Sequence, residues 1–135
     1  MKDFEINRVL QAKNIDIEYM GMGTMNEYDT QLMRYYVLTI NNYCFEYYEG
    51  KGLEELNELN RREKIISSVV CLINEYQYYQ DFKFRTLDDF MSEFGYTDYE
   101  RAKKVFDVMS YNSEKLKKVF TAEELDYLLE QTADY

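Results

Sequence analysis

The 135-residue sequence contains no histidine, no proline and no tryptophan, and it contains only two cysteines. The absence of histidine excludes nucleophilic catalysis by a Ser–His or Cys–His pair, because the imidazole is the general base of both. A structural zinc site is disfavoured as well, since such sites draw on four Cys or His ligands. Cys44 and Cys71 are too few for a disulfide framework, so we expect a reducing cytoplasmic compartment and interpret both cysteines as small apolar packing residues.

A long hydrophobic run is also missing. The N-terminal segment has no apolar core of signal-peptide length, and no stretch approaches about 18 consecutive apolar residues. We therefore expect a protein that is neither secreted by the usual route nor membrane-spanning. The chain is long enough to bury a core and contains no linker, repeat or low-complexity tract, so a single domain over residues 1–135 is predicted.

Charge of one sign dominates the composition, with 26 Asp and Glu against 16 Lys and Arg and a net charge of −10. Such a chain repels a phosphate backbone, which disfavours direct nucleic-acid binding. Residues 1–80 and 81–135 each carry 13 acidic and 8 basic side chains, so no basic domain is hidden beside an acidic one. Two shorter segments have a local excess of one charge, and a solvated helix face also explains each of them. Residues 101–118 hold six basic side chains, Arg101, Lys103, Lys104, Lys115, Lys117 and Lys118, whereas residues 121–135 hold five acidic and no basic ones, Glu123, Glu124, Asp126, Glu130 and Asp134.

Aromatic residues are abundant, with 15 Tyr and 8 Phe. This abundance argues against a disordered acidic tail, because disordered acidic chains are poor in aromatics. Several tyrosines exceed what a chain of this size can bury. Because tyrosine is enriched at protein interfaces, they have either an interface role or an ordinary amphipathic surface role. These tyrosines are Tyr35, Tyr48, Tyr78, Tyr79 and Tyr111.

Periodicity predicts β-structure in the N-terminal half. Residues 15–20 alternate in polarity, as a half-buried strand does, and residues 21–29 are predicted to form a loop. Residues 35–48 predict a hairpin around Asn41-Asn42, since Asn tolerates the positive φ of a two-residue turn. That register places only apolar and aromatic side chains on one face and pairs Ile40 with Tyr43, Leu38 with Phe45, and Tyr36 with Tyr47.

The second half is predicted to be helical. Residues 61–79 have an apolar face at helical spacing, and residues 53–59 are expected to form a short helix or an irregular approach to it. Capping signatures at Thr86, Thr97 and Thr121 predict helices over 87–94, 98–111 and 122–132, with a left-handed stop at Gly95 and a break or cap at Asn112-Ser113. Together these elements predict an α+β fold, with a small antiparallel sheet packed against an α-helix and a C-terminal helical group.

Motifs for cofactors and metals are weak. The Gly-Met-Gly of residues 21–23 lacks the third glycine and the following helix of a dinucleotide-binding loop. The adjacent pairs Asp88-Asp89 and Glu54-Glu55 diverge on a helix, and no EF-hand pattern is present. We therefore predict no catalytic residue, no cofactor-binding residue and no metal ligand. The acidic residues near the caps, such as Asp89, Glu100 and Glu124, have a structural explanation as capping or dipole partners.

A series of segments after residue 65 follows a recognisable order. An apolar helix containing Val69–Leu72 is followed by TLDDFMSEFGYTDYERAKKVF at residues 86–106 and by the basic, Leu-containing segment 112–120. This order resembles that of an uncharacterised family of small acidic phage and prophage proteins, over roughly half of the chain. That family often has Trp and Cys in the short helix, where this chain has Phe90 and Met91. The family has no assigned catalytic residues to transfer, and the resemblance implies a mobile-element origin and an anti-defence role.

These features favour an interaction protein rather than an enzyme. We expect a phage-type inhibitor, located in the cytoplasm of a bacterial host cell, that binds a nucleic-acid-targeting defence protein such as a CRISPR effector or a restriction enzyme. As a DNA mimic it would occupy a basic channel, because opposite charges speed encounter and fix register. The acidic side chains of residues 121–135 are the candidate contact residues. Two alternatives remain: a nucleic-acid accessory protein that uses the basic residues 101–118, and a carboxylate–metal enzyme.

Overall fold

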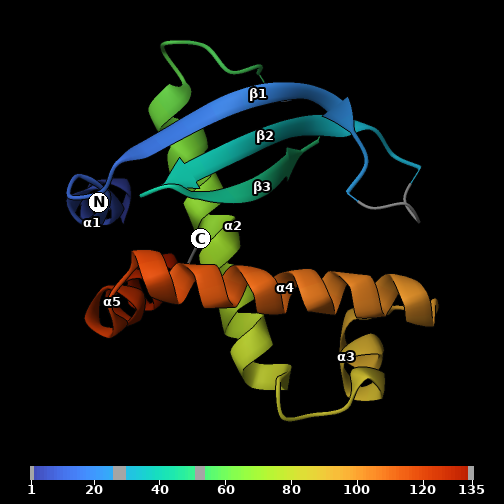
Figure 1. Cartoon of the computed structure of the whole chain (residues 1–135). Helices are drawn as coiled ribbons and strands as arrows, with labels where there is room; N and C mark the ends of the chain where they lie inside the picture. Colours follow the sequence, from blue (N-terminus) through green and yellow to red (C-terminus); the bar gives the residue numbers. More distant parts are fainter. Residues whose placement is uncertain (1, 26–29, 51–53, 134–135) are drawn as a thin grey trace.

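The computed structural model describes residues 2–25, 30–50 and 54–133, and it has the predicted α+β architecture (Figure 1). A three-stranded antiparallel sheet from the N-terminal half packs against helices. In chain order the elements are α1 (Lys2–Leu10), β1 (Ile15–Gly23), β2 (Met33–Ile40), β3 (Tyr43–Glu49), α2 (Arg61–Phe82), α3 (Leu87–Phe94), α4 (Tyr99–Val119) and α5 (Ala122–Thr132).

The β2–β3 hairpin has the predicted turn and register. Asn41 and Asn42 both have positive φ, 48° and 75°, as a two-residue hairpin turn requires. Leu38 is paired with Phe45, and the flanking pairs follow the same register. Because every second side chain points to the same face, this register sends one apolar and aromatic set to the core.

The predicted loop over residues 21–29 is wrong at its start. Strand β1 continues to Gly23, and its pairing with β2 shifts register between Tyr19 and Gly21, which leaves Met20 in a bulge. Gly21 has a φ of 108°, a conformation that a side chain disfavours, so glycine allows the strand to resume after the bulge. Residues 26–29 of the predicted loop lie outside the described residues.

One face of the sheet forms the main core. Tyr36, Leu38 and Phe45 of this face are almost fully buried. Residues from α1, α2, the end of α4 and α5 cover them, and α2 crosses behind the sheet (Figure 1). The helical residues of this core are Ile6, Leu10, Ile66, Val69, Val70, Leu72, Ile73, Leu116, Val119, Leu125 and Leu128.

A second, aromatic cluster lies at the far end of α2. Phe90 of α3 is its centre, with ring centroids of Phe82, Phe94 and Phe106 at 6.0, 5.0 and 5.3 Å. Gly95, with a φ of 74°, ends α3 in the predicted left-handed conformation. This cluster joins α3 to the first half of α4 and extends the helical layer beyond the sheet.

Two helices are longer than predicted. Helix α2 runs to Phe82, three residues beyond the predicted segment 61–79. Helix α4 runs without interruption to Val119, so the predicted break at Asn112-Ser113 is wrong. Both side chains are buried at this point, which explains why polar residues that resemble a cap lie inside a helix.

The predicted caps are confirmed at two of three positions. Thr86 and Thr121 each form a reciprocal capping box, with Asp89 and Glu124 respectively. At α4, however, the N-cap is Asp98 rather than Thr97, and its carboxylate accepts from the Arg101 N–H. Asp is at least as good a cap as Thr, so the helix begins one residue later than the predicted cap at Thr97 implied.

Helix α1 was not predicted, because the N-terminal sequence lacks a clear cap. The approach to α2 is irregular over residues 54–60, where Asn60 and Asn57 exchange side-chain and backbone hydrogen bonds, and Leu53 lies outside the described residues. None of the helices in the described part of the chain has both the length and the apolar composition needed to cross a membrane.

Candidate partner-binding surfaces

Four of the five predicted acidic residues, Glu123, Glu124, Asp126 and Glu130, lie on α5. The opposite side of this helix is buried through Leu125, Leu128 and Thr132. Glu123, Asp126 and Glu130 are exposed. They occupy positions i, i+3 and i+7, which share one face of an α-helix. Within the described residues, none of these three carboxylates forms an ion pair. We call them the α5 acidic row.

Glu124 does not belong to this row. Its carboxylate accepts from the Thr121 N–H at 2.8 Å and from the Lys13 Nζ at 2.9 Å. Burial alone raises the pKa of Glu124, but the hydrogen bonds from Thr121 and Lys13 and the Lys13 charge together hold that pKa below its ordinary value. Glu124 therefore stabilises the fold and ties α5 to the segment after α1. Asp134, the fifth predicted contact residue, lies outside the described residues.

The basic stretch of residues 101–118 is engaged within the molecule. Lys103 pairs with Asp107 at 3.1 Å and Lys117 pairs with Glu114 at 3.7 Å. Lys115 donates to the backbone oxygen of Cys44. The remaining three side chains also have partners, which include the Tyr96 ring under Arg101 and the Tyr43 ring under Lys118. The alternative of a nucleic-acid accessory protein therefore has no group of free cations on α4.

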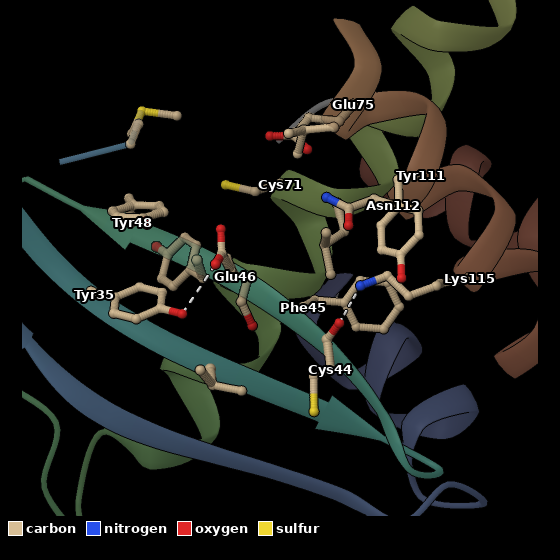
Figure 2. A pocket seen from close by; sticks show the side chains of 16 residues that line it. Tyr35, Cys44, Phe45, Glu46, Tyr48, Cys71, Glu75, Tyr111, Asn112 and Lys115 are labelled. Atoms are coloured by element: carbon tan, nitrogen blue, oxygen red, sulfur yellow. Dashed lines mark hydrogen bonds between the residues drawn. The ribbon is translucent and has the colours of Figure 1, made fainter. Parts of the chain in front are cut away.

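A groove that the sequence did not predict lies along β3. β3 is an edge strand, and α2 and α4 flank its free edge (Figure 2). A cavity of about 550 Å³ is lined from the strand by Phe45 and Tyr48, from α2 by Leu72, and from α4 by Val108 and Tyr111. A second cavity of about 380 Å³ continues it toward α3. We call the two together the β3 groove.

Four of the five surplus tyrosines line this groove. Tyr35 and Tyr48 stack on one another with centroids 5.0 Å apart, and Tyr111 is 68% exposed at the opposite wall. Tyr78 lines the second cavity. Only Tyr79 lies elsewhere, where it accepts a hydrogen bond from Ser110. The interface role of these tyrosines stays a prediction, but the fold gathers most of them at one place.

The interpretation of both cysteines as buried packing residues is wrong. Cys44 and Cys71 are exposed free thiols, and both line the β3 groove (Figure 2). Cys44 belongs to the outer face of the hairpin, and Cys71 lies on the side of α2 that faces the cavity. Desolvation and the nearby Glu75 carboxylate raise the pKa of the Cys71 thiol. It is therefore a poor nucleophile at neutral pH.

Glu75 is a partly buried carboxylate in the groove. It lines both cavities from α2, and no hydrogen bond or ion pair involves its carboxylate among the described residues. Desolvation by burial raises the pKa of Glu75 to about 7. Its neighbour Glu46 differs, because the Tyr35 hydroxyl donates to it at 3.1 Å. Sequence patterns did not single out Glu75, because its spacing fits an ordinary solvated position of the helix.

No group of three or more Cys, Asp or Glu side chains within residues 2–25, 30–50 and 54–133 is arranged to hold a metal ion. The carboxylate–metal alternative thus gains no candidate site. Comparison of the chain with protein-family models, with curated proteins and with solved structures finds no match. The resemblance to small phage proteins accordingly stays a prediction.

Proposed function

We propose that this chain is a mobile-element protein that binds and inhibits a host nucleic-acid-targeting defence protein, such as a CRISPR effector or a restriction enzyme. The α5 acidic row is the observation that carries the proposal. Glu123, Asp126 and Glu130 are exposed and form no ion pair with any residue that the structure describes, on a helix whose other side is fixed in the core. They are therefore presented on a rigid element rather than on a loop.

The spacing of the row suits a surface that binds phosphates. Steps of three and four residues along a helix are about 4.5 and 6 Å. One DNA strand carries a phosphate about every 3.4 Å of helix axis, so the row is sparser than DNA but of the same order. The net charge of −10 adds a long-range attraction to any strongly basic surface. A channel lined by Lys and Arg is the partner surface that these features complement.

Two basic side chains close to α5, Lys117 and Lys13, are paired with carboxylates outside the row. Lys117 and Asp126 line the same shallow depression, but the Lys117 ammonium pairs with Glu114. Lys13 is held by Glu124 and lies over the Phe120 ring. The molecule thus satisfies its own cations near α5 with other groups. An incoming Arg or Lys meets carboxylates that are not paired with any cation of residues 2–25, 30–50 and 54–133.

Plasmid cleavage by a panel of purified RNA-guided CRISPR nucleases and restriction endonucleases tests the proposal. We expect at least one nuclease to be inhibited by the wild-type chain in a dose-dependent manner. The triple variant Glu123→Gln/Asp126→Asn/Glu130→Gln is expected to inhibit at least tenfold more weakly, because it removes all three carboxylates. Undiminished cleavage by the whole panel contradicts the proposal.

A matched variant separates local from total charge. Glu54→Gln/Asp81→Asn/Glu93→Gln also removes three exposed carboxylates, but none of them lies on α5. We expect this control to inhibit nearly as well as the wild-type chain. If the two triple variants lose inhibition equally, net charge rather than the α5 acidic row determines binding, and the assignment of the site is wrong.

A further inference from the structure

The free edge of β3 presents unpaired backbone groups to the β3 groove. In a two-residue hairpin the residues that flank the turn form a hydrogen-bonded pair, and such pairs recur at every second position. With Ile40 opposite Tyr43, residues 43, 45, 47 and 49 bond to β2. The N–H and C=O groups of Cys44, Glu46 and Tyr48 therefore point away from the sheet. The hydrogen bond from Lys115 to the Cys44 carbonyl oxygen agrees with this direction.

The outward backbone oxygen of one of these three residues already accepts a hydrogen bond, and the backbone groups of the other two remain open to a partner. Lys115 of α4 donates a hydrogen bond to the Cys44 carbonyl oxygen. Farther along the strand, no backbone hydrogen bond outside the hairpin reaches Glu46 or Tyr48 from the described residues. An unpaired strand edge is a template for another extended chain.

Exposed apolar side chains surround this edge. Eleven large hydrophobic side chains of the described residues are exposed, and five of them line the groove: Met25, Tyr78, Phe94, Val108 and Tyr111. The two cavities share Met25, Glu46, Glu75 and Val108, so the groove is continuous from β3 to α3. A concentration of exposed apolar surface of this kind marks an interaction site rather than chance exposure.

The charges of the groove define the occupant further. Glu75 has no hydrogen-bond or ion-pair partner among the described residues, whereas Glu46 accepts a hydrogen bond from the Tyr35 hydroxyl and is attracted by the Lys115 charge. The cation Lys115 is committed to the Cys44 oxygen and lies over the Phe45 and Tyr111 rings, each with a centroid 4.7 Å away. A partly buried carboxylate without a partner favours an incoming ammonium or guanidinium group.

We propose that the β3 groove binds an extended peptide segment of a partner protein, which adds to the sheet as a fourth strand beside Glu46 and Tyr48. Alternate side chains of the segment pack on the apolar walls formed by α2 and α4, and a Lys or Arg of the segment pairs with Glu75. Strand addition of this kind takes affinity from main-chain hydrogen bonds and specificity from alternate side-chain pockets. The inference does not rest on the α5 acidic row.

A second copy of this chain is a poorer occupant than a peptide. Antiparallel pairing of two β3 edges centred on Glu46 would place two carboxylates opposite one another, which is destabilising. Helix α4 also flanks the edge on one side, so a whole sheet approaches less easily than a single extended strand (Figure 2). The groove therefore suits a segment with no fold of its own around it.

The test begins with a displayed library of random eight-residue peptides, selected for binding to the full-length folded chain. We expect enrichment of peptides that alternate apolar residues and contain a Lys or Arg. Selection of no peptide, or of peptides without a basic residue, overturns the proposal. An enriched peptide is then added to isotope-labelled protein, and amide hydrogen exchange is measured by NMR.

Exchange at individual amides distinguishes strand addition from other modes of binding. In the free chain the N–H groups of Glu46 and Tyr48 are expected to exchange much faster than those of Phe45 and Tyr47. The peptide is expected to slow only the fast pair, at least tenfold. A peptide that binds without protecting the Glu46 or Tyr48 amide overturns the proposal. Slower exchange of these amides in the protein alone at the same concentration, caused by self-association, also overturns it.

Variants test the assigned charge pair. Glu75→Gln is expected to lower the affinity of the chain for the selected peptide about tenfold. Glu63→Gln, on the exposed first turn of the same helix and outside the groove, is expected to leave affinity unchanged. Methylation of alternate peptide amide nitrogens is expected to abolish binding in one register and to be tolerated in the other. Equal tolerance at every amide contradicts strand addition.

Discussion

The Lys115 ammonium of α4 donates a hydrogen bond to the backbone carbonyl oxygen of Cys44, the first outward-facing residue of β3. The two residues are 71 positions apart in the chain. Both residues line the β3 groove, so this contact joins the strand edge to α4 there. It also places a cation on a free strand edge, and lysine at such positions discourages edge-to-edge association.

The first prediction is that Lys115→Met promotes self-association of the chain. The substitution uncovers a third edge residue and removes the cation, so β3 becomes a longer and more apolar template. Sedimentation velocity over a concentration series is expected to show dimers or larger species. Lys117→Met is the matched control, because it removes the same charge from an exposed pair with Glu114 on the same helix. Identical behaviour of the two variants contradicts the role assigned to Lys115.

The second prediction concerns the cap of α4. Asp98→Ala is expected to lower the free energy of unfolding by about 1 kcal/mol, because the Arg101 N–H loses its acceptor. Thr97→Ala, one residue earlier, is expected to change it by less than about 0.5 kcal/mol, as is usual for an exposed position. Urea denaturation of the two variants measures both values. The opposite order would restore Thr97 as the cap.

The third prediction is a pH dependence of stability caused by Glu75. Burial raises the pKa of Glu75 from 4.5 to about 7 in the folded chain. An acid whose folded pKa is raised destabilises the fold while it is ionised, so this cost is present above pH 7 and disappears as the pH falls from 7 to 4.5. Glu75→Gln is therefore expected to stabilise the chain at pH 8, on the order of 1–3 kcal/mol, and to have little effect near pH 4.5.

Thermal or urea denaturation at the two pH values checks this difference. The exposed carboxylate Glu93, replaced by Gln, is the control and should show no comparable change. An equal effect of Glu75→Gln at both pH values shows that side-chain packing rather than ionisation is responsible. The other titratable groups that line the same cavities are Tyr35, Cys44, Glu46, Tyr47, Tyr48, Cys71, Tyr78, Tyr96, Lys104, Tyr111 and Lys115.

The fourth prediction concerns the buried pair of Glu49 and Lys64, whose charged atoms lie 2.6 Å apart. The two residues are only 5% and 7% exposed. Lys64→Met leaves the Glu49 carboxylate buried with only weaker partners among the described residues, Arg34 at 3.8 Å and the Tyr36 hydroxyl at 3.5 Å, so we expect a loss of about 3 kcal/mol. The double variant Lys64→Met/Glu49→Leu is expected to recover part of that loss, because no unpaired buried carboxylate remains. A double variant less stable than Lys64→Met contradicts this account.

Much of the fold followed from local signals that are strong at short range. The Asn41-Asn42 turn and the alternating hairpin specify one register, since a slip by one residue would move the apolar set to the other face. The reciprocal caps at Thr86 and Thr121 fix two helix starts. The left-handed backbone conformation, which glycine adopts readily, fixes one helix end at Gly95. In each case the residues that decide the structure are within a few positions of one another.

The wrong predictions arise where long-range packing decides the structure. Asn112 resembles a helix stop, but tertiary burial keeps α4 continuous at this position. Cys71 resembles a core residue on α2, yet it is exposed and lines the groove between α2, β3 and α4. Glu75 could not be distinguished from other acidic helix residues, since its burial depends on β3 and α4. Long-range packing determines these features, and a single sequence does not encode it in a local pattern.

The α5 acidic row was predicted only in part from the sequence. The sequence located the acidic segment, but it did not separate Glu124, which the fold uses for a cap and for the Lys13 pair, from Glu123 and Asp126. Capping predicted the first of these contacts. The second depends on α1, which was not predicted.

The salt dependence of binding tests the central claim most directly. The affinity of the chain for a purified CRISPR effector or restriction enzyme that it inhibits is measured in a salt series at constant pH. Charge mimicry by Glu123, Asp126 and Glu130 predicts that affinity falls steeply with salt and that Glu123→Gln/Asp126→Asn/Glu130→Gln flattens this dependence. Affinity that does not change with salt, or a slope that the triple variant leaves unaltered, would contradict it.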